Sequence, residues 1–235
     1  MVIILKSILY SIYFLKLALK NYIPVIVYLI SSQLIIIKIQ NVLLILIFFV
    51  GYLLISAPLV VNIFRNIIAN DHLFNSYAYF FEKTYTKLFI KKLIYLIVSI
   101  VTIYVVHIIV LSPFFPSDIS KMTALLYILF MYMIYIYTRI MFILPSASIN
   151  ISRGLRDSYL LTKNKSIKIY FLYIAIIVPY LFLNLSISSF IEKLGYNYIF
   201  IFIMIIFQVF FTIVSNALIA YLYRDLVEVP AHDHS

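Results

Sequence analysis

Cysteine is absent from all 235 residues, which excludes disulfides, thiolate metal sites, iron–sulfur clusters and cysteine nucleophiles. Only three glycines are present, so glycine-rich phosphate-binding loops are not expected. The chain also lacks the His-Glu-x-x-His and Gly-x-Ser-x-Gly motifs of zinc proteases and serine hydrolases. No apolar run contains a pair of acidic residues that could act as an intramembrane aspartyl site. We therefore predict a protein that is not an enzyme and uses no cofactor or metal.

Charged residues are scarce at 11%, whereas hydrophobic residues reach 66%. A typical soluble domain is about half apolar and a quarter charged. A soluble fold of this length could not bury so much apolar surface, and large exposed apolar patches drive aggregation. The composition predicts an integral membrane protein. Tryptophan is absent too, so an interfacial aromatic belt would have to use the 22 tyrosines.

Six apolar segments approach the ~20 residues that a membrane-spanning helix needs. They are apolar on every face, whereas the strands of a membrane barrel alternate apolar and polar residues. The first is short and carries Ser31, Ser32 and Gln33. We predict an all-α bundle of about six transmembrane helices, in a single membrane domain over 1–228 with a polar tail at 229–235. The predicted spans are Tyr22–Ile37, Val42–Ile63, Leu93–Leu111, Thr123–Leu144, Ile167–Ile187 and Tyr198–Leu222.

The net charge of +10 is distributed unevenly about these spans. With six spans, 15 of the 18 basic residues fall on the side that holds both termini. Lys and Arg favour the cytoplasmic side, so we predict cytoplasmic termini in a bacterial inner membrane. On this interpretation the basic residues contact anionic lipid head groups rather than nucleic acid. The predicted partners are therefore the bilayer and its head groups, while protein partners stay open.

Short amphipathic helices are predicted outside the spans. The N-terminal stretch 1–20 lacks a signal-peptide cleavage site and should lie at the membrane surface or pack under the bundle. Apolar residues at helical spacing predict surface helices over Leu73–Lys87 and Gly154–Thr162. Three hairpin units are an open alternative description, based on two similar segments, Ala57–Arg65 and Leu144–Arg153. In both, a proline near the end of a span is expected to bend the chain out of the membrane.

One region has a recognisable pattern. Arg139 precedes Leu144-Pro145-Ser-Ala, and the segment Gly154-Leu-Arg-Asp-Ser158-Tyr-Leu-Leu-Thr162-Lys follows. This pattern resembles the YciC-like family of bacterial membrane proteins, and is similar to the membrane domain attached to some glycerophosphodiester phosphodiesterases. The resemblance covers the C-terminal half well and the N-terminal half only in layout. It implies a membrane fold. No phosphodiesterase domain is present, so that activity is not implied.

Arg139 is the most unusual charge, because it lies five residues inside the end of the fourth predicted span. A charge in hydrocarbon is costly and often functional. The alternative is that Arg139 reaches the cytoplasmic interface, about 8 Å away, and holds the next segment in place. We expect the structural role, with Asp157 or Asp225 as a carboxylate partner.

Other polar residues fall within the spans. Gln208 and Asn216 share a face of the last predicted span, where amides commonly join helices; a substrate path is the alternative. His107 is a lone histidine, expected to make a hydrogen bond rather than to bind a metal. Two functions stay open: a non-catalytic assembly, regulatory or lipid-environment component, and a transporter or permease for a small or lipidic molecule. A polar cavity at the bilayer midplane would favour transport.

Overall fold

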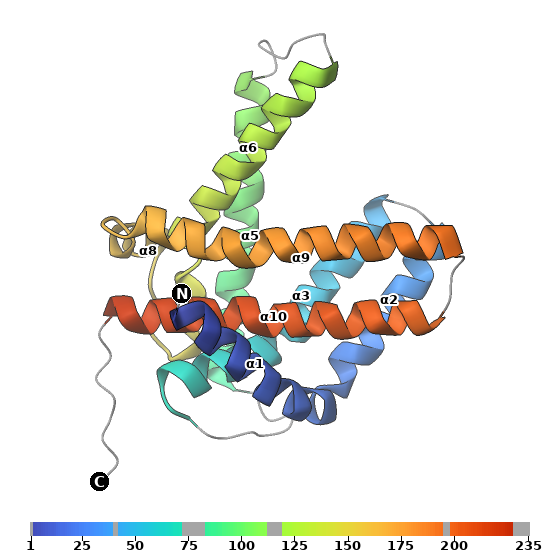
Figure 1. The fold of residues 1–235 in the computed structure, drawn as a ribbon. Helices are drawn as coiled ribbons and strands as arrows, with labels where there is room; N and C mark the ends of the chain where they lie inside the picture. Colours follow the sequence, from blue (N-terminus) through green and yellow to red (C-terminus); the bar gives the residue numbers. More distant parts are fainter. Residues whose placement is uncertain (1, 40–41, 72–82, 112–118, 195–197, 228–235) are drawn as a thin grey trace.

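The computed structural model describes residues 2–39, 42–71, 83–111, 119–194 and 198–227. All regular secondary structure in these ranges is helical, which confirms the all-α prediction. Figure 1 shows the helices in chain order. They are α1 (Val2–Asn21), α2 (Ile23–Ile39), α3 (Val42–Ile68), α5 (Thr84–Leu111), α6 (Ile119–Ile140), α7 (Ile143–Ser148), α8 (Leu155–Leu161), α9 (Ser166–Leu194) and α10 (Tyr198–Val227).

Five of the described helical segments are long and apolar enough to cross a membrane, and they correspond to the last five predicted spans. They are Ile47–Ile68, Thr84–Leu111, Leu125–Ser148, Ser166–Leu183 and Phe202–Val227. The first predicted span corresponds to α2, which forms a helix of 17 residues and falls short of the length of the other five. The protein is thus a membrane protein, and its described residues contain five long apolar helices and two shorter ones, in α1 and α2.

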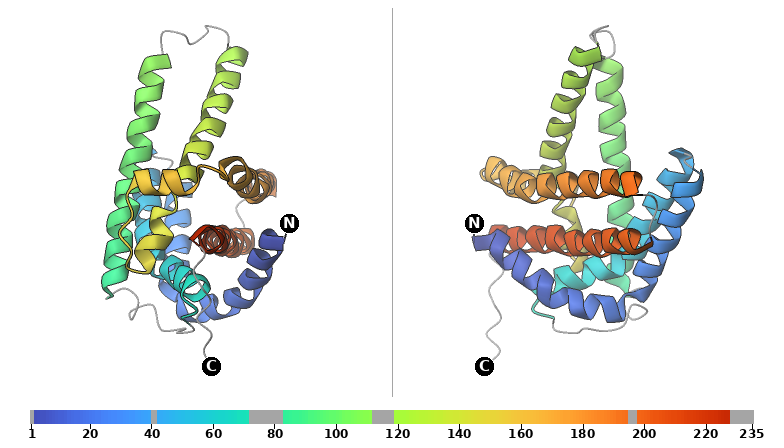
Figure 2. Two further views of the ribbon diagram at one scale, coloured as in Figure 1. Left: turned by 90° about the vertical axis from the view of Figure 1, so that its left-hand side faces the viewer. Right: turned by 45° about the vertical axis from the view of Figure 1, so that its right-hand side comes forward.

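The α5–α6 pair and the α9–α10 pair each form a hairpin (Figures 1 and 2). The α5–α6 hairpin projects from the rest of the molecule, and α9 and α10 lie side by side across its direction. The buried residues of α5 all fall in its first half. Because α5, α9 and α10 contain 28, 29 and 30 residues, they are about 42–45 Å long at 1.5 Å per residue. That length exceeds the ~30 Å hydrocarbon layer, so these three helices can cross it while strongly tilted. The shorter α6 has 22 residues and is about 33 Å long, so it can cross only with a small tilt.

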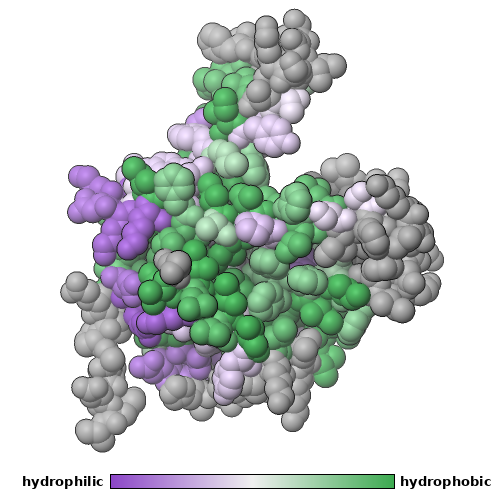
Figure 3. All heavy atoms as spheres, in the orientation of Figure 1, coloured by the Kyte–Doolittle hydropathy of each residue, from purple (hydrophilic) through white to green (hydrophobic). Residues whose placement is uncertain are grey.

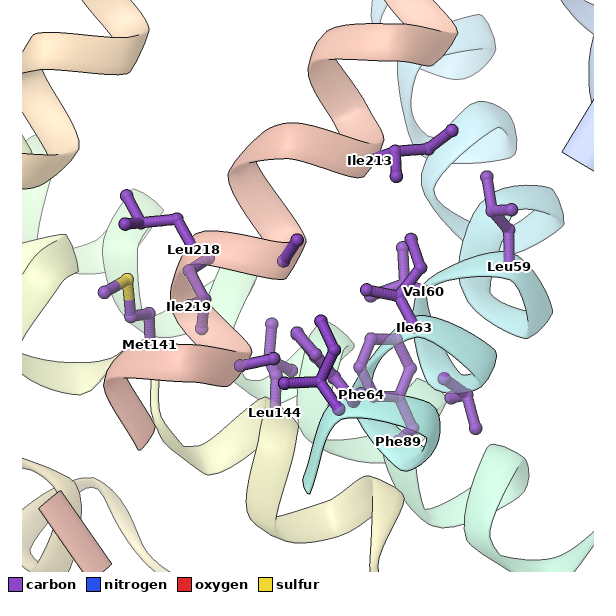
Figure 4. Packing of buried hydrophobic residues seen from close by; sticks show 14 of the residues in the cluster. Leu59, Val60, Ile63, Phe64, Phe89, Met141, Leu144, Ile213, Leu218 and Ile219 are labelled. Atoms are coloured by element: carbon purple, nitrogen blue, oxygen red, sulfur yellow. The ribbon is translucent and has the colours of Figure 1, made fainter. Parts of the chain in front are cut away.

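A hydrophobic core joins α3, α5, α7 and α10. Figure 4 shows Ile63 and Phe64 of α3 beside Phe89 of α5, with Ile213 and Leu218 on α10. All five side chains are at most 2% exposed. This core contacts the first half of α5. It therefore holds the base from which the α5–α6 hairpin projects.

The N-terminal helix α1 packs against α10, as one of the two predicted placements requires. Ser7, Ser11 and Phe14 are fully buried, and the Tyr10 ring lies edge-on to Tyr221 at 6.4 Å. The two serine hydroxyls donate to carbonyls one turn earlier in α1, so these small polar residues are satisfied where they are buried. The serine spacing of four residues places both on the face toward α10.

Gly51 allows α2 to approach α3 closely. A Cβ atom at this position would overlap the hydroxyl of Tyr28, which donates to the Phe48 carbonyl at 3.0 Å. The lack of a side chain at Gly51 therefore makes room for an interhelical hydrogen bond.

Three sequence predictions need correction or fall elsewhere. Pro58 does not end α3, which continues for ten residues beyond it to Ile68. The proposed repeat segments also differ, because Asn62 is helical whereas Asn150 has a φ of 63° after the end of α7. The helix predicted over Gly154–Thr162 is confirmed as α8, while its position at the membrane surface stays a prediction. Of Leu73–Lys87, residues 73–82 lie outside the described residues, and Thr84–Lys87 belong to α5.

Candidate functional site

Arg139 lies near the C-terminal end of α6 and is only 4% exposed. Its Nε donates to the Thr162 hydroxyl at 2.7 Å, and one terminal nitrogen donates to the Tyr159 carbonyl at 2.9 Å. The other terminal nitrogen donates to the Tyr135 hydroxyl at 3.0 Å. The guanidinium also stacks over the Tyr159 ring, 3.8 Å from its centroid. Arg139 therefore fastens the end of α6 to the end of α8.

Neither carboxylate predicted to pair with Arg139 does so among the described residues. Asp157 accepts from the backbone N–H of Gly154 at 2.9 Å and thereby caps the start of α8. Asp225 is exposed on α10. The reason is that Arg139 meets the C-terminal end of α8, whose unpaired carbonyls carry partial negative charge, whereas Asp157 belongs at the opposite end. The structural role expected of Arg139 is consistent with its contacts, but the carboxylate partner was wrong.

The residues that hold Arg139 belong to the pattern that carried the family resemblance. The Ser158 hydroxyl donates to the backbone carbonyl of Arg139 at 3.0 Å, and both Ser158 and Thr162 are fully buried. They are four residues apart, so they face the same side of α8. The spacing from Arg139 to this Ser-x-x-x-Thr pair was visible in the sequence, but the bonds between them were not.

A second arginine, Arg65, is held at the end of α3. It forms an ion pair with Asp71 at 2.6 Å and donates to the Ser148 carbonyl, the last of α7, at 3.2 Å. Its guanidinium lies 4.2 Å from the centroid of the Tyr85 ring on α5. Arg65 thus joins α3 to α5 and α7, and sequence reasoning had not singled out this role.

Two further cations bind backbone carbonyls at the same end of the molecule. Arg224 of α10 donates to the Ile67 carbonyl at the end of α3 at 3.1 Å. The Lys92 ammonium donates to the Arg153 carbonyl at 2.9 Å. We call Arg65, Lys92, Arg139 and Arg224 the bracing cations.

Other cations at this end are exposed. Figure 3 shows hydrophilic side chains at the left of the view, beside a mainly hydrophobic face over α9 and α10. The exposed cations of α8, the turn after it and the first turn of α9 are Arg156, Lys163, Lys165 and Lys168. We call these four the surface cations.

A pocket of about 150 Å³ lies between α3, α9 and α10. Its residues lie near the middle of each helix, far from the basic end. The apolar walls are formed by Phe49, Ile176, Ile177 and Phe211. The polar lining consists of Tyr52, Tyr180, Gln208, Thr212 and Ser215.

The structure separates the two amides predicted on α10. Gln208 lines the pocket, whereas Asn216 donates to the Thr212 carbonyl of its own helix at 2.7 Å. Thr212 joins the helices here, because its hydroxyl lies 2.6 Å from that of Tyr52 on α3. The interhelical bond predicted for the amides is thus made by a threonine and a tyrosine instead.

The lone histidine makes a local contact. A ring nitrogen of His107 lies 2.7 Å from the Ile103 carbonyl one turn earlier, and its ring contacts Tyr132 of α6 at 5.3 Å. Within the described ranges, no group of three His, Asp or Glu side chains is close enough to hold a metal ion.

Comparisons with protein families, with curated proteins and with solved structures find no match.

Proposed function

We propose that this chain is a non-catalytic component of the bacterial cytoplasmic membrane, whose basic end binds anionic lipid head groups on the cytoplasmic face. Both termini would lie on that face. We also propose that the chain is related to the YciC-like family, whose pattern its sequence resembles. The observation that carries it is the division of the cations at the basic end into two groups. The bracing cations are engaged by the fold, whereas the surface cations are exposed around them.

The surface cations suit a membrane interface. Lys163 and Lys165 are exposed just before α9 and Lys168 is exposed in its first turn, and the residues that follow are strongly apolar. Charges placed there can reach the phosphates while the helix enters the hydrocarbon. A basic residue near an anionic surface contributes about 1 kcal/mol of attraction.

The proposal can be tested in nanodiscs of phosphatidylcholine with and without phosphatidylglycerol. We expect the native chain to unfold at a higher temperature when the anionic lipid is present. Replacing Lys163, Lys165 and Lys168 by glutamine should remove most of that difference. The matched control replaces the same three by arginine, which keeps the charge and should keep the difference. A glutamine variant that responds to the anionic lipid as the native chain does would contradict the proposal.

Transport of a small or lipidic molecule is the second candidate, and the pocket beside Gln208 at mid-helix depth favours it. A transporter must open this space to each face in turn. The test is uptake across proteoliposomes by the native chain and by Ser215→Leu, which would fill the pocket. Uptake that is lost in this variant would favour transport over the first candidate.

A further inference from the structure

We propose that the pocket between α3, α9 and α10 binds a neutral ring, of about the size of benzene, that carries a hydrogen-bonding oxygen, as phenols and quinones do. The inference concerns the middle of the helices, so it does not depend on lipid binding at the basic end. Size, charge and hydrogen bonding each limit the ligand.

The size follows from the cavity. The pocket is partly open, and its volume is about 150 Å³. An enclosed apolar cavity of that volume holds one benzene ring, so a single ring of this size fits here. The walls suit a ring, because Tyr180 and Phe211 already lie with their ring centroids 4.8 Å apart at its side. An aromatic or quinonoid ring could pack against this pair in the offset or edge-on manner that aromatic groups prefer.

The lining requires a neutral ligand. Its described residues are apolar, hydroxyl-bearing or amide-bearing, and none is charged. An ion in this position would lose its hydration without gaining a counter-charge, which is strongly unfavourable in a membrane interior.

Gln208 supplies the hydrogen-bonding group. Its backbone carbonyl accepts from the Thr212 hydroxyl at 2.8 Å, but its side-chain amide makes no hydrogen bond within the described residues. An amide in apolar surroundings is costly when it is unpaired. By contrast, Asn216, two turns later on α10, has its amide engaged with its own helix. The free amide of Gln208 can donate to a ligand carbonyl or accept from a ligand hydroxyl.

The test measures binding of 4-fluorophenol and fluorobenzene by fluorine NMR, with the protein in phosphatidylcholine nanodiscs and empty nanodiscs as the reference for partition into lipid. We expect saturable binding, with the phenol about tenfold tighter than the ring without oxygen, since one net hydrogen bond gives about that factor. Gln208→Leu should abolish this preference. Asn216→Leu, which removes an amide from the same helix outside the pocket, should keep it.

Two further results would overturn the proposal. Absence of saturable binding would show that the pocket takes no such ring, and equal binding of the two probes by the native chain would show an apolar void without recognition of oxygen. Competition by 2-decyl-1,4-benzoquinone distinguishes the source of the ligand. If the quinone displaces 4-fluorophenol at a much lower concentration than phenol does, the natural ligand has a tail and is dissolved in lipid. If the two competitors act at similar concentrations, the natural ligand is a small free molecule.

Discussion

Replacing Arg139 by methionine should destabilise the folded protein without removing a ligand contact. Methionine has a similar length and retains the apolar packing of the arginine stem. The substitution removes three donated hydrogen bonds, to Thr162, Tyr159 and Tyr135. It also removes the contact between the guanidinium and the Tyr159 ring.

The magnitude follows from these contacts. Each hydrogen bond from a charged donor contributes about 1.5–3 kcal/mol. Part of that total is offset because methionine avoids the cost of burying a charge, which amounts to several kcal/mol. We expect a net loss of about 2–4 kcal/mol, or a fall of roughly 5–15 °C in melting temperature for a chain of this size.

The assay is thermal unfolding in detergent, followed by the fraction that remains monodisperse on size-exclusion chromatography. Arg139→Lys should lower the melting temperature less than Arg139→Met does. The lysine ammonium can still reach some of the acceptors, although the planar geometry of the guanidinium is lost. Thr162→Val removes the hydroxyl that accepts from Arg139. If this hydrogen bond is energetically important, the variant with both Arg139→Met and Thr162→Val should lose less stability than the sum of the losses in the two single variants.

Two results would refute this reasoning. A melting temperature for Arg139→Met within a degree or two of the native value would show that the bonds add no net stability. Native stability combined with loss of a cellular phenotype would make Arg139 a ligand site.

Three other predictions test the fold. Gly51→Val should weaken the association of α2 with α3 and lower the melting temperature, because the new side chain collides with the Tyr28 hydroxyl. Adding Tyr28→Leu to the same chain removes that hydroxyl and should restore part of the stability, as thermal unfolding of both variants would measure. Asp71→Asn should cost about 1–3 kcal/mol of stability in the same assay, because the half-buried Arg65 loses its ion-pair partner. An equal loss with Asp225→Asn, which changes an exposed carboxylate, would contradict this. Reporter fusions at Lys38, Ser117 and Leu194 should report outside, and those at Asn75, Asn164 and His234 inside; any inverted result would remove a span.

The helices could be predicted from the sequence because each depends on a local property. Long apolar runs can satisfy their backbone only as helices in hydrocarbon, so α3, α5, α9 and α10 follow directly from composition. Their ends were less predictable. Pro58 lies within α3 because a membrane helix tolerates proline when neighbouring groups compensate for the lost bond.

The partners of the polar residues could not be predicted, because they depend on which helices meet. Nothing in the sequence near Arg65 or Arg139 specifies that one would bind the end of α7 and the other the end of α8. The pocket beside Gln208 depends on three helices from distant parts of the chain, so only its amide was visible beforehand.

Three of the four bracing cations bind carbonyls at helix ends, which gives a reason for so much positive charge at one end of the molecule. The fourth, Lys92, binds the Arg153 carbonyl, which lies between α7 and α8. Arg65 binds the last carbonyl of α7, Arg139 binds a carbonyl in the last turn of α8, and Arg224 binds one at the end of α3. The final four carbonyls of a helix have no partner within it, and they form the negative end of its dipole. Helices that end at a membrane surface need donors there, and water is only partly available. In the proposed orientation, Lys and Arg favour the cytoplasmic side. The same cations would then also supply the donors for the helix ends that meet there.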